Sequence, residues 1–173
     1  MPQLSAPLMQ IAASRYGVVT AEQLTGDGFT RNSVRRLVTQ NVLIRIHQGV
    51  YRHAMAADSF ESRCVAACLA DSRAVVTGVA AARLWNFHHV FRPERPVVLV
   101  EHDSTPLTSG VLLRRTNLLE AEEWLVRPDG ISVASACRAW FDCARDVDDR
   151  RFERLTEWEL VELISLRART HAA

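Results

Sequence analysis

Apolar residues recur every three or four positions in three short runs near the N-terminus, which is the spacing of one helix face. The runs cover residues 4–17, 18–28 and 29–41. Pro7 falls in the first turn of the first run, where a helix tolerates proline, and Thr20 and Gln23 have the spacing of a capping box. Thr30 precedes the third run as a candidate N-cap. The pattern predicts three successive helices.

The period of the pattern falls to two between residues 42 and 53. Two isoleucines alternate with Arg45 and His47, a Gln48–Gly49 pair can form a turn, and a second short run follows it. This is the pattern of a two-stranded hairpin. Three helices followed by a hairpin predict a winged helix-turn-helix, in which the last helix lies in the DNA major groove with its N-terminal residues at the base edges.

The predicted third helix and hairpin concentrate arginine on the side opposite the apolar stripe. Arginine presents a planar fork of donors that fits a guanine edge or a phosphate, and asparagine can pair with an adenine edge. We therefore predict that Arg31 and Asn32 reach bases and that the other arginines hold phosphates. The predicted DNA-binding residues are Thr30, Arg31, Asn32, Ser33, Arg35, Arg36, Arg45, His47 and Arg52. The alternative is that these arginines form only the solvated face of an amphipathic helix.

The rest of the chain mixes helical and strand-like runs. Helices are predicted at 58–72, 78–90 and 135–147, and β-rich runs at 73–78, 95–103, 109–118 and 123–135. A turn containing Pro106 joins the second and third β-rich runs, and Asp129–Gly130 marks a hairpin in the last one. We predict an α+β protein with three parts: a winged helix-turn-helix (1–53), a small α+β domain with a short antiparallel sheet (54–150), and a C-terminal amphipathic helical segment (151–173).

Charge divides the chain in the same way as the pattern does. Through His53 there are six arginines against two acids, whereas the remainder has fifteen arginines against eighteen acids. Acids are therefore scarce in the basic part, where an ordinary solvated face would mix both signs. No apolar run approaches the ~20 residues of a membrane span, and the N-terminus lacks the pattern of a signal peptide, so we expect a cytoplasmic protein.

The chain contains no lysine. Mechanisms that need a catalytic or phosphate-binding lysine are therefore excluded for this chain alone. His88, His89, His102 and Asp103 could act in acid–base or metal chemistry, but no third element lies at a known ligand spacing. A hydrolase that uses these four residues is the weakest hypothesis, and we expect neither enzyme activity nor a cofactor.

Four cysteines lie in apolar surroundings, at positions 64, 68, 137 and 143. Neither pair has the C-x2-C spacing of common zinc modules, so the sequence does not indicate a metal site. Buried free thiols are the expectation for such positions.

The order of these features resembles the AbiEi family of antitoxins from type IV toxin–antitoxin and phage-abortive-infection systems. The resemblance rests on the GVVT entry to the second helix, the arginine-rich third helix and the I-x-x-G-V-Y hairpin. In the later part of the chain it rests on TGVAAARLW and RPDGISVASACRAWFDCA, so it covers residues 4–145. Many members continue into a further C-terminal domain, for which the sequence after the acidic run at Asp142–Asp149 is too short.

This resemblance implies a winged-helix protein that represses its own operon by binding inverted repeats in double-stranded DNA, two copies at a time. It also implies a nucleotidyltransferase-like toxin as a protein partner. On the resemblance, the DNA contacts map to Arg31, Asn32, Arg35, Arg36, Arg45 and Arg52. The alternative function is a protein-interaction module that binds a toxin or effector and has only weak affinity for DNA.

Overall fold

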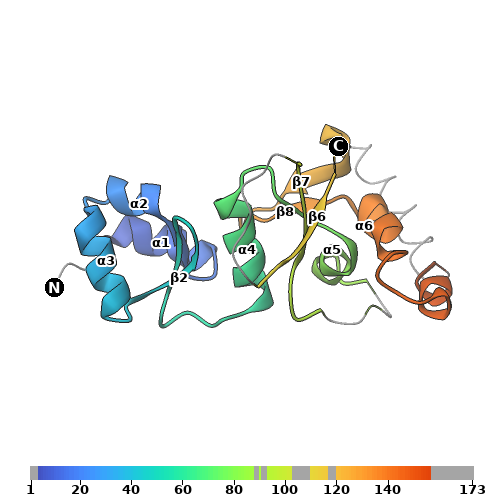
Figure 1. Cartoon of the computed structure of the whole chain (residues 1–173), viewed down its shortest axis with the longest axis horizontal. Coiled ribbons are helices and arrows are strands. Elements are labelled where there is room, and N and C mark those ends of the chain that lie inside the picture. The colour runs from blue at the N-terminus through green and yellow to red at the C-terminus, as the bar shows by residue number, and fades with distance from the viewer. Residues whose placement is uncertain (1–3, 88–89, 91–92, 103–109, 117–119, 157–173) are drawn as a thin grey trace.

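The computed structural model of the chain describes residues 4–87, 90, 93–102, 110–116 and 120–156. These residues form an elongated molecule (Figure 1), with three N-terminal helices at one end and a five-stranded sheet in the other half. The α+β fold class that the sequence predicts is confirmed. We call residues 4–53 the head and residues 54–156 the body.

The head contains all three predicted helices. They are α1 (Ala6–Ser14), α2 (Ala21–Gly26) and α3 (Arg31–Thr39). Ser5 and Thr30 cap α1 and α3 through their side-chain oxygens, and Thr20 forms the predicted capping box with Gln23 at the start of α2. Each cap satisfies backbone N–H groups that the first turn of a helix leaves unpaired, so local residues set where each helix begins.

The head also contains a three-stranded antiparallel sheet. Its strands are β1 (Val18–Thr20), β2 (Leu43–His47) and β3 (Val50–His53), in the order β1-β3-β2. Strands β2 and β3 form the predicted hairpin, and β2 is an edge strand of the sheet. The sequence does not predict β1, because three residues are too few to show a period.

Both faces of this sheet are covered. Val19 and Leu43 pack on one face against apolar side chains of the three helices. Val18 and Val50 face the other way and join the core of the body, against helix α4 (Phe60–Ala70). Adjacent strand residues point to opposite faces, so neighbouring valines serve different cores. The head and the body therefore share a core rather than merely touching.

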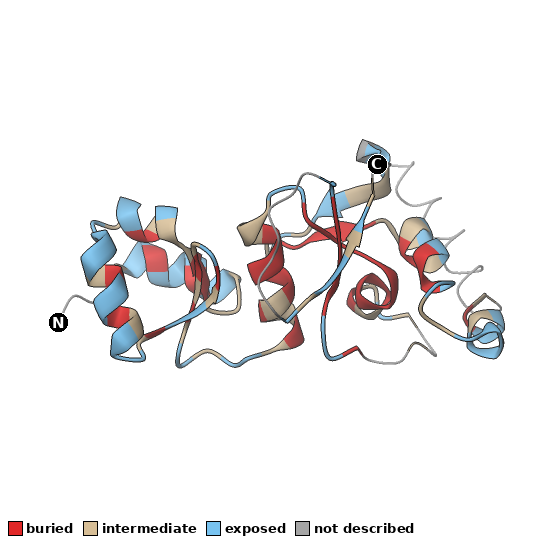
Figure 2. Ribbon diagram, viewed as in Figure 1, coloured by how far each residue is buried: buried red, intermediate tan, exposed pale blue. Residues whose placement is uncertain are grey.

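The body is built on a five-stranded sheet in the order β6-β5-β4-β8-β7. Its strands are β4 (Val75–Val76), β5 (Val97–Val100), β6 (Leu112–Arg115), β7 (Trp124–Val126) and β8 (Ser132–Ala134). Besides α4, its helices are α5 (Gly78–Leu84), α6 (Ala136–Cys143) and the 3₁₀ turn η1 (Ala121–Glu123). Figure 2 shows α4 and α5 buried over most of their length, which suits their small side chains, whereas α3 is exposed along one side.

The sheet of the body is mixed, whereas we predicted an antiparallel one. Two of its pairings are antiparallel, β4 with β5 and β7 with β8, and the second of these is the hairpin predicted at Asp129–Gly130. The other two, β4 with β8 and β5 with β6, are parallel. Parallel neighbours need a connection that returns the chain to the same end of the sheet, so β5 and β6 are not joined by the simple turn that we predicted. Pro106 lies outside the described residues.

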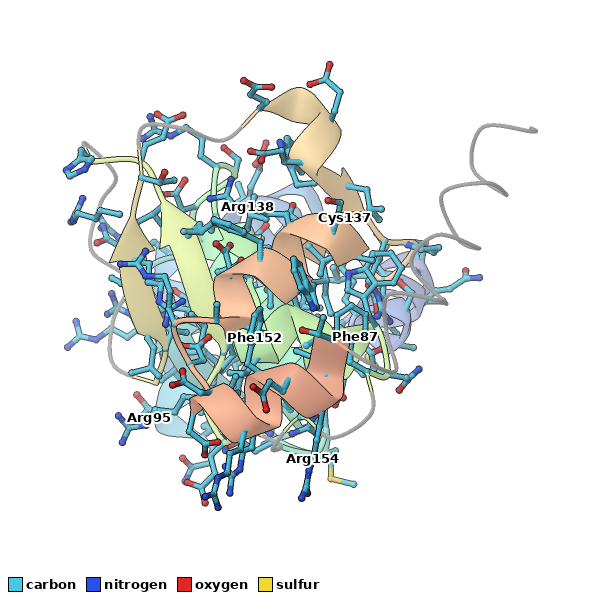
Figure 3. All side chains as sticks on the ribbon, turned by 90° about the vertical axis from the view of Figure 1, so that its right-hand side faces the viewer. Phe87, Arg95, Cys137, Arg138, Phe152 and Arg154 are labelled. Carbon is cyan, nitrogen blue, oxygen red and sulfur yellow. The ribbon has the colours of Figure 1, made fainter. Side chains whose placement is uncertain are left out.

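A buried polar network ties α6 to the rest of the body. Asp142 is 5% exposed and accepts hydrogen bonds from the Thr77 hydroxyl and from Arg138 Nε, the latter at 3.0 Å. Arg138, labelled in Figure 3, also donates from Nη1 to both carboxylate oxygens of Glu123, at 2.9 and 2.8 Å. The buried carboxylate is thus paired and hydrogen-bonded, as such a group must be.

Residues 149–156 are helical, and 151–156 are the described start of the predicted C-terminal segment. Leu155 is buried in the core of the body, and the Phe152 ring lies 5.2 Å from that of Trp140. The apolar side of these turns therefore packs on the body (Figure 3). Residues 157–173 lie outside the described part of the chain.

The cysteines are free thiols as predicted, but only three are buried. Burial raises the pKa of Cys64 well above its usual value and raises those of Cys68 and Cys143 to about 12. Cys137 is instead exposed on α6, because this position falls on the solvent side of an amphipathic helix.

Candidate nucleic-acid interface

Helix α3 presents side chains that the sequence predicts for DNA contact. Its first turn is held by Thr30, whose hydroxyl accepts a hydrogen bond from the Ser33 N–H at 3.2 Å. Val34 and Leu37, 7% and 4% exposed, point into the core of the head. This phase of the helix leaves polar side chains exposed on the opposite side, among them Arg31, Asn32, Arg35 and Arg36.

A groove of about 880 Å³ lies between α2, α3 and the β2–β3 hairpin. Predicted DNA-binding residues line it from two elements: Arg31, Asn32 and Arg35 from α3, and Arg45 from β2. The hairpin adds Gln48 and Tyr51, which are not among the predicted DNA contacts. The structure therefore brings four of the predicted residues together around one concave surface. Arg36 is exposed but does not line this groove.

A β-bulge decides which hairpin residues face the groove. Arg45 pairs with Tyr51, and His47 pairs with Val50, so Ile46 is an extra residue in the ladder. A regular two-residue hairpin would instead place Arg52 opposite Arg45. The bulge thus puts Tyr51 beside Arg45 and moves His47 and Arg52 to the opposite face of the sheet. Strict alternation across the turn could not have identified Tyr51.

Arg52 does not reach solvent, so the predicted phosphate contact needs correction. The residue is 7% exposed, and its Nη1 donates to the backbone carbonyl of Ala56 at 2.9 Å. Its Nη2 lies 3.9 Å from Asp58 Oδ1. Because these partners belong to the body, Arg52 joins the hairpin to the body instead of contacting DNA.

His47 is also withdrawn from the predicted surface. It is 3% exposed, and burial lowers the pKa of its imidazole. A buried histidine that is neutral at pH 7 neither touches a phosphate nor adds a positive charge. The cause is again the bulge, which turns this side chain towards the body.

Thr30 and Ser33 have local roles in the helix cap. Besides the bond to Thr30 from the Ser33 N–H, the Ser33 hydroxyl donates to the Thr30 carbonyl at 2.8 Å. Both side chains therefore fix the start of α3 and with it the positions of Arg31 and Asn32. A direct contact of either hydroxyl with DNA stays a prediction.

The exposed arginines of the head carry uncompensated charge. The guanidinium groups of Arg31, Arg35, Arg36 and Arg45 form no hydrogen bond or ion pair with any residue that the structure describes. Asp27 Oδ2 accepts the Ser5 N–H at 3.0 Å, and hydrogen bonds from the Ser5 side chain and backbone lower the pKa of this carboxyl, which pairs with none of these arginines. The surface around the groove is therefore positive.

Within the described ranges, no three histidine, cysteine or acidic side chains gather as metal ligands would. His88, His89 and Asp103 lie outside the described residues, and His102 is exposed. None of the described helices is long and apolar enough to cross a membrane.

Three capped helices, a β1-β3-β2 sheet with a hairpin wing and an arginine-lined groove beside the third helix define a winged helix-turn-helix domain. Residues 7–53 match the family described as "Transcriptional regulator, AbiEi antitoxin". The head is thus similar to this family of regulators, which is not a classical enzyme family, and the resemblance drawn from the sequence is confirmed there. The match ends at His53, so the resemblance of the body stays a prediction.

The whole fold also has a counterpart among solved structures. The crystal structure of the RV2827C protein from Mycobacterium tuberculosis aligns with 88% of this chain and 70% of its own, with a TM-score of 0.54. The two sequences are 17% identical over the match, so the similarity establishes the fold and nothing about partners. A search of curated protein sequences found no match.

Proposed function

We propose that this protein is a sequence-specific DNA-binding repressor that controls its own promoter, as the antitoxin of a type IV toxin–antitoxin pair. The observation that carries the proposal is the arginine-lined groove between α3 and the wing. The head carries four uncompensated guanidinium groups, whereas the rest of the chain is mildly acidic. This concentration of positive charge favours a polyanion as the ligand. The family match of the head supports the same class of function.

The residues take different roles in this proposal. Arg31 and Asn32 lie in the first turn of α3, the part of a recognition helix that meets base edges. Arg35, Arg36 and Arg45 follow along the helix and on the wing, where they contact phosphates. The phosphate contacts position the protein and make affinity depend on salt, whereas the base contacts select the sequence.

The test measures binding of the full chain by fluorescence anisotropy, to its own upstream DNA and to a scrambled duplex of equal length, at several salt concentrations. We expect tighter binding to the upstream DNA. Asn32→Ala should weaken operator binding by about 1 to 3 kcal/mol and leave scrambled DNA nearly unaffected. Arg35→Ala should weaken both complexes equally and reduce the slope of log K against log salt by about 0.9.

A matched control replaces an arginine far from the groove. Arg154 is exposed on the last described helical turns (Figure 3), at the opposite end of the molecule from the head. Arg154→Ala removes the same charge and should leave both affinity and salt slope unchanged. Equal, weak and salt-insensitive binding of both duplexes by the native chain would rule out a repressor.

Exposed apolar side chains on the body favour protein binding as a second function. Leu125 and Val126 on the edge strand β7 are 40% and 60% exposed, and Phe141 on α6 is 65% exposed. An edge strand leaves backbone N–H and C=O groups without a neighbouring strand, and exposed apolar side chains on it favour contact with another chain. Co-expression with the product of the adjacent gene, followed by size-exclusion chromatography, tests this function. A stoichiometric complex lost in Val126→Glu and Phe141→Glu would support it, and separate elution of the two native proteins would contradict it.

A further inference from the structure

A second, smaller groove lies on the other side of the edge strand β2, at the junction of head and body. It has a volume of about 280 Å³. Charged side chains from three elements line it: Arg45 from β2, Asp58 and Arg63 from the start of α4 and the residues before it, and Arg95 from the segment before β5. Arg45 also lines the groove beside α3. The two grooves are therefore neighbours, with one arginine between them.

The single carboxylate in this lining does not neutralise the groove. Asp58 accepts from Arg63 Nε and Nη2 at 3.0 and 2.9 Å, a bidentate pair that lowers the pKa of the carboxyl. The charge of Arg63 is thus already compensated. The guanidinium groups of Arg45 and Arg95 form no hydrogen bond or ion pair with any described residue. Two positive charges therefore remain for an external anion.

The fold holds Arg95 in place without engaging its side chain. Arg63 Nη1 donates to the carbonyl of Glu94 at 3.0 Å and so anchors the backbone beside Arg95. The Arg95 side chain is exposed and points away from the body (Figure 3). An anchored backbone that carries an unpaired guanidinium suits an anion contact, because binding then orders the arginine side chain but not the backbone beneath it.

We propose that the DNA-contact surface extends past the wing onto the body, where Arg95 binds a backbone phosphate beyond those reached by Arg45. This inference rests on the proposed function. Duplex DNA carries one negative charge per ~1.7 Å of its axis, so a protein face that continues along the helix meets further phosphates. The contact carries no sequence information. It lengthens the footprint and fixes the direction in which the body lies along the DNA.

The experiment compares Arg95→Ala with Arg154→Ala in the full chain, by anisotropy with operator and scrambled duplexes at ~0.05 and ~0.15 M salt. One phosphate contact raises the association constant by a factor of about c to the power −0.9, where c is the salt concentration in M. Arg95→Ala should therefore weaken binding about fivefold at the higher salt and about fifteenfold at the lower one, equally for both duplexes. Arg154→Ala should bind as the native protein does.

Shortening the operator duplex one base pair at a time from each end locates the contact. At the end of the duplex that Arg95 contacts, removal of the outermost phosphates should lower the affinity of the native protein to that of Arg95→Ala. The affinity of Arg95→Ala itself should not change with this truncation. Native-like affinity and salt slope for Arg95→Ala, together with a clear loss for Arg35→Ala, would overturn the inference and leave the repressor intact. Absence of DNA binding by the native protein would overturn both.

Discussion

Replacing Arg52 with alanine separates the structural role seen for this residue from the DNA contact expected of it. The change removes a charged hydrogen bond of 2.9 Å to the Ala56 carbonyl and leaves that carbonyl without its donor. Such a bond contributes about 1.5 to 3 kcal/mol. The pair with Asp58 adds less than about 1 kcal/mol, because its atoms are 3.9 Å apart and the Asp58 side chain is 51% exposed. The expected loss of stability is therefore about 2 to 4 kcal/mol.

The assay combines thermal unfolding, followed by circular dichroism, with the salt dependence of DNA binding. For a chain of this size the loss corresponds to a fall in Tm of roughly 5 to 15 °C. The salt slope of Arg52→Ala, measured well below its Tm, should equal that of the native protein. Arg36→Ala is the reciprocal control: stability within ~0.5 kcal/mol of native, but a salt slope lower by about 0.9. An unchanged Tm with a reduced slope in Arg52→Ala would mean that Arg52 contacts DNA and does not join the hairpin to the body.

Two further predictions concern backbone geometry and thiol chemistry. Gly17→Ala should destabilise the chain by about 2 to 4 kcal/mol in a denaturant titration, since its φ is +81° and a Cβ there would lie 2.2 Å from Ala56 Cβ. Gly26→Ala, with no atom within 4 Å, should change stability by less than ~1 kcal/mol, and similar values for both would contradict this account. At pH 8 a thiol reagent should label Cys137 alone in the native chain, because burial raises the pKa of the other three thiols, whereas all four react in denaturant. Rapid native labelling of a second cysteine would show that the core opens.

The shared core has a consequence for the proposed binding of DNA. Val18 and Val50 tie the head sheet to α4, and the Tyr16 hydroxyl donates to Asp129 Oδ2 at 3.0 Å, where Arg127 Nη2 also donates at 2.9 Å. Apolar packing and polar contacts thus join the head to two separate parts of the body. The head and the body should therefore approach DNA as one unit, which is the condition under which Arg95 can add to a footprint begun by α3.

The sequence by itself determined the elements whose signals are local. The helix caps and the buried stripe of α3 depend on residues three or four positions apart, so the sequence predicts them without any tertiary contact. The caps are Ser5, Thr20 and Thr30. The exposed set on α3 follows directly from that stripe. The Asp129–Gly130 hairpin is local in the same sense. The winged-helix class and the arginine face of α3 were predictable for this reason.

The tertiary structure decided the features that depend on residues far apart in the chain. The bulge between Arg45 and His47 decides which side chains of β2 face the head helices and which face α4. The pattern of β2 alone does not reveal the bulge, because both faces of the sheet are covered by other elements. Arg52 becomes structural because the body supplies a carbonyl, and β5 and β6 pair in parallel, which no local pattern of either strand reveals. Arg95 lies 50 residues after Arg45, and only packing of body against head brings both to one groove.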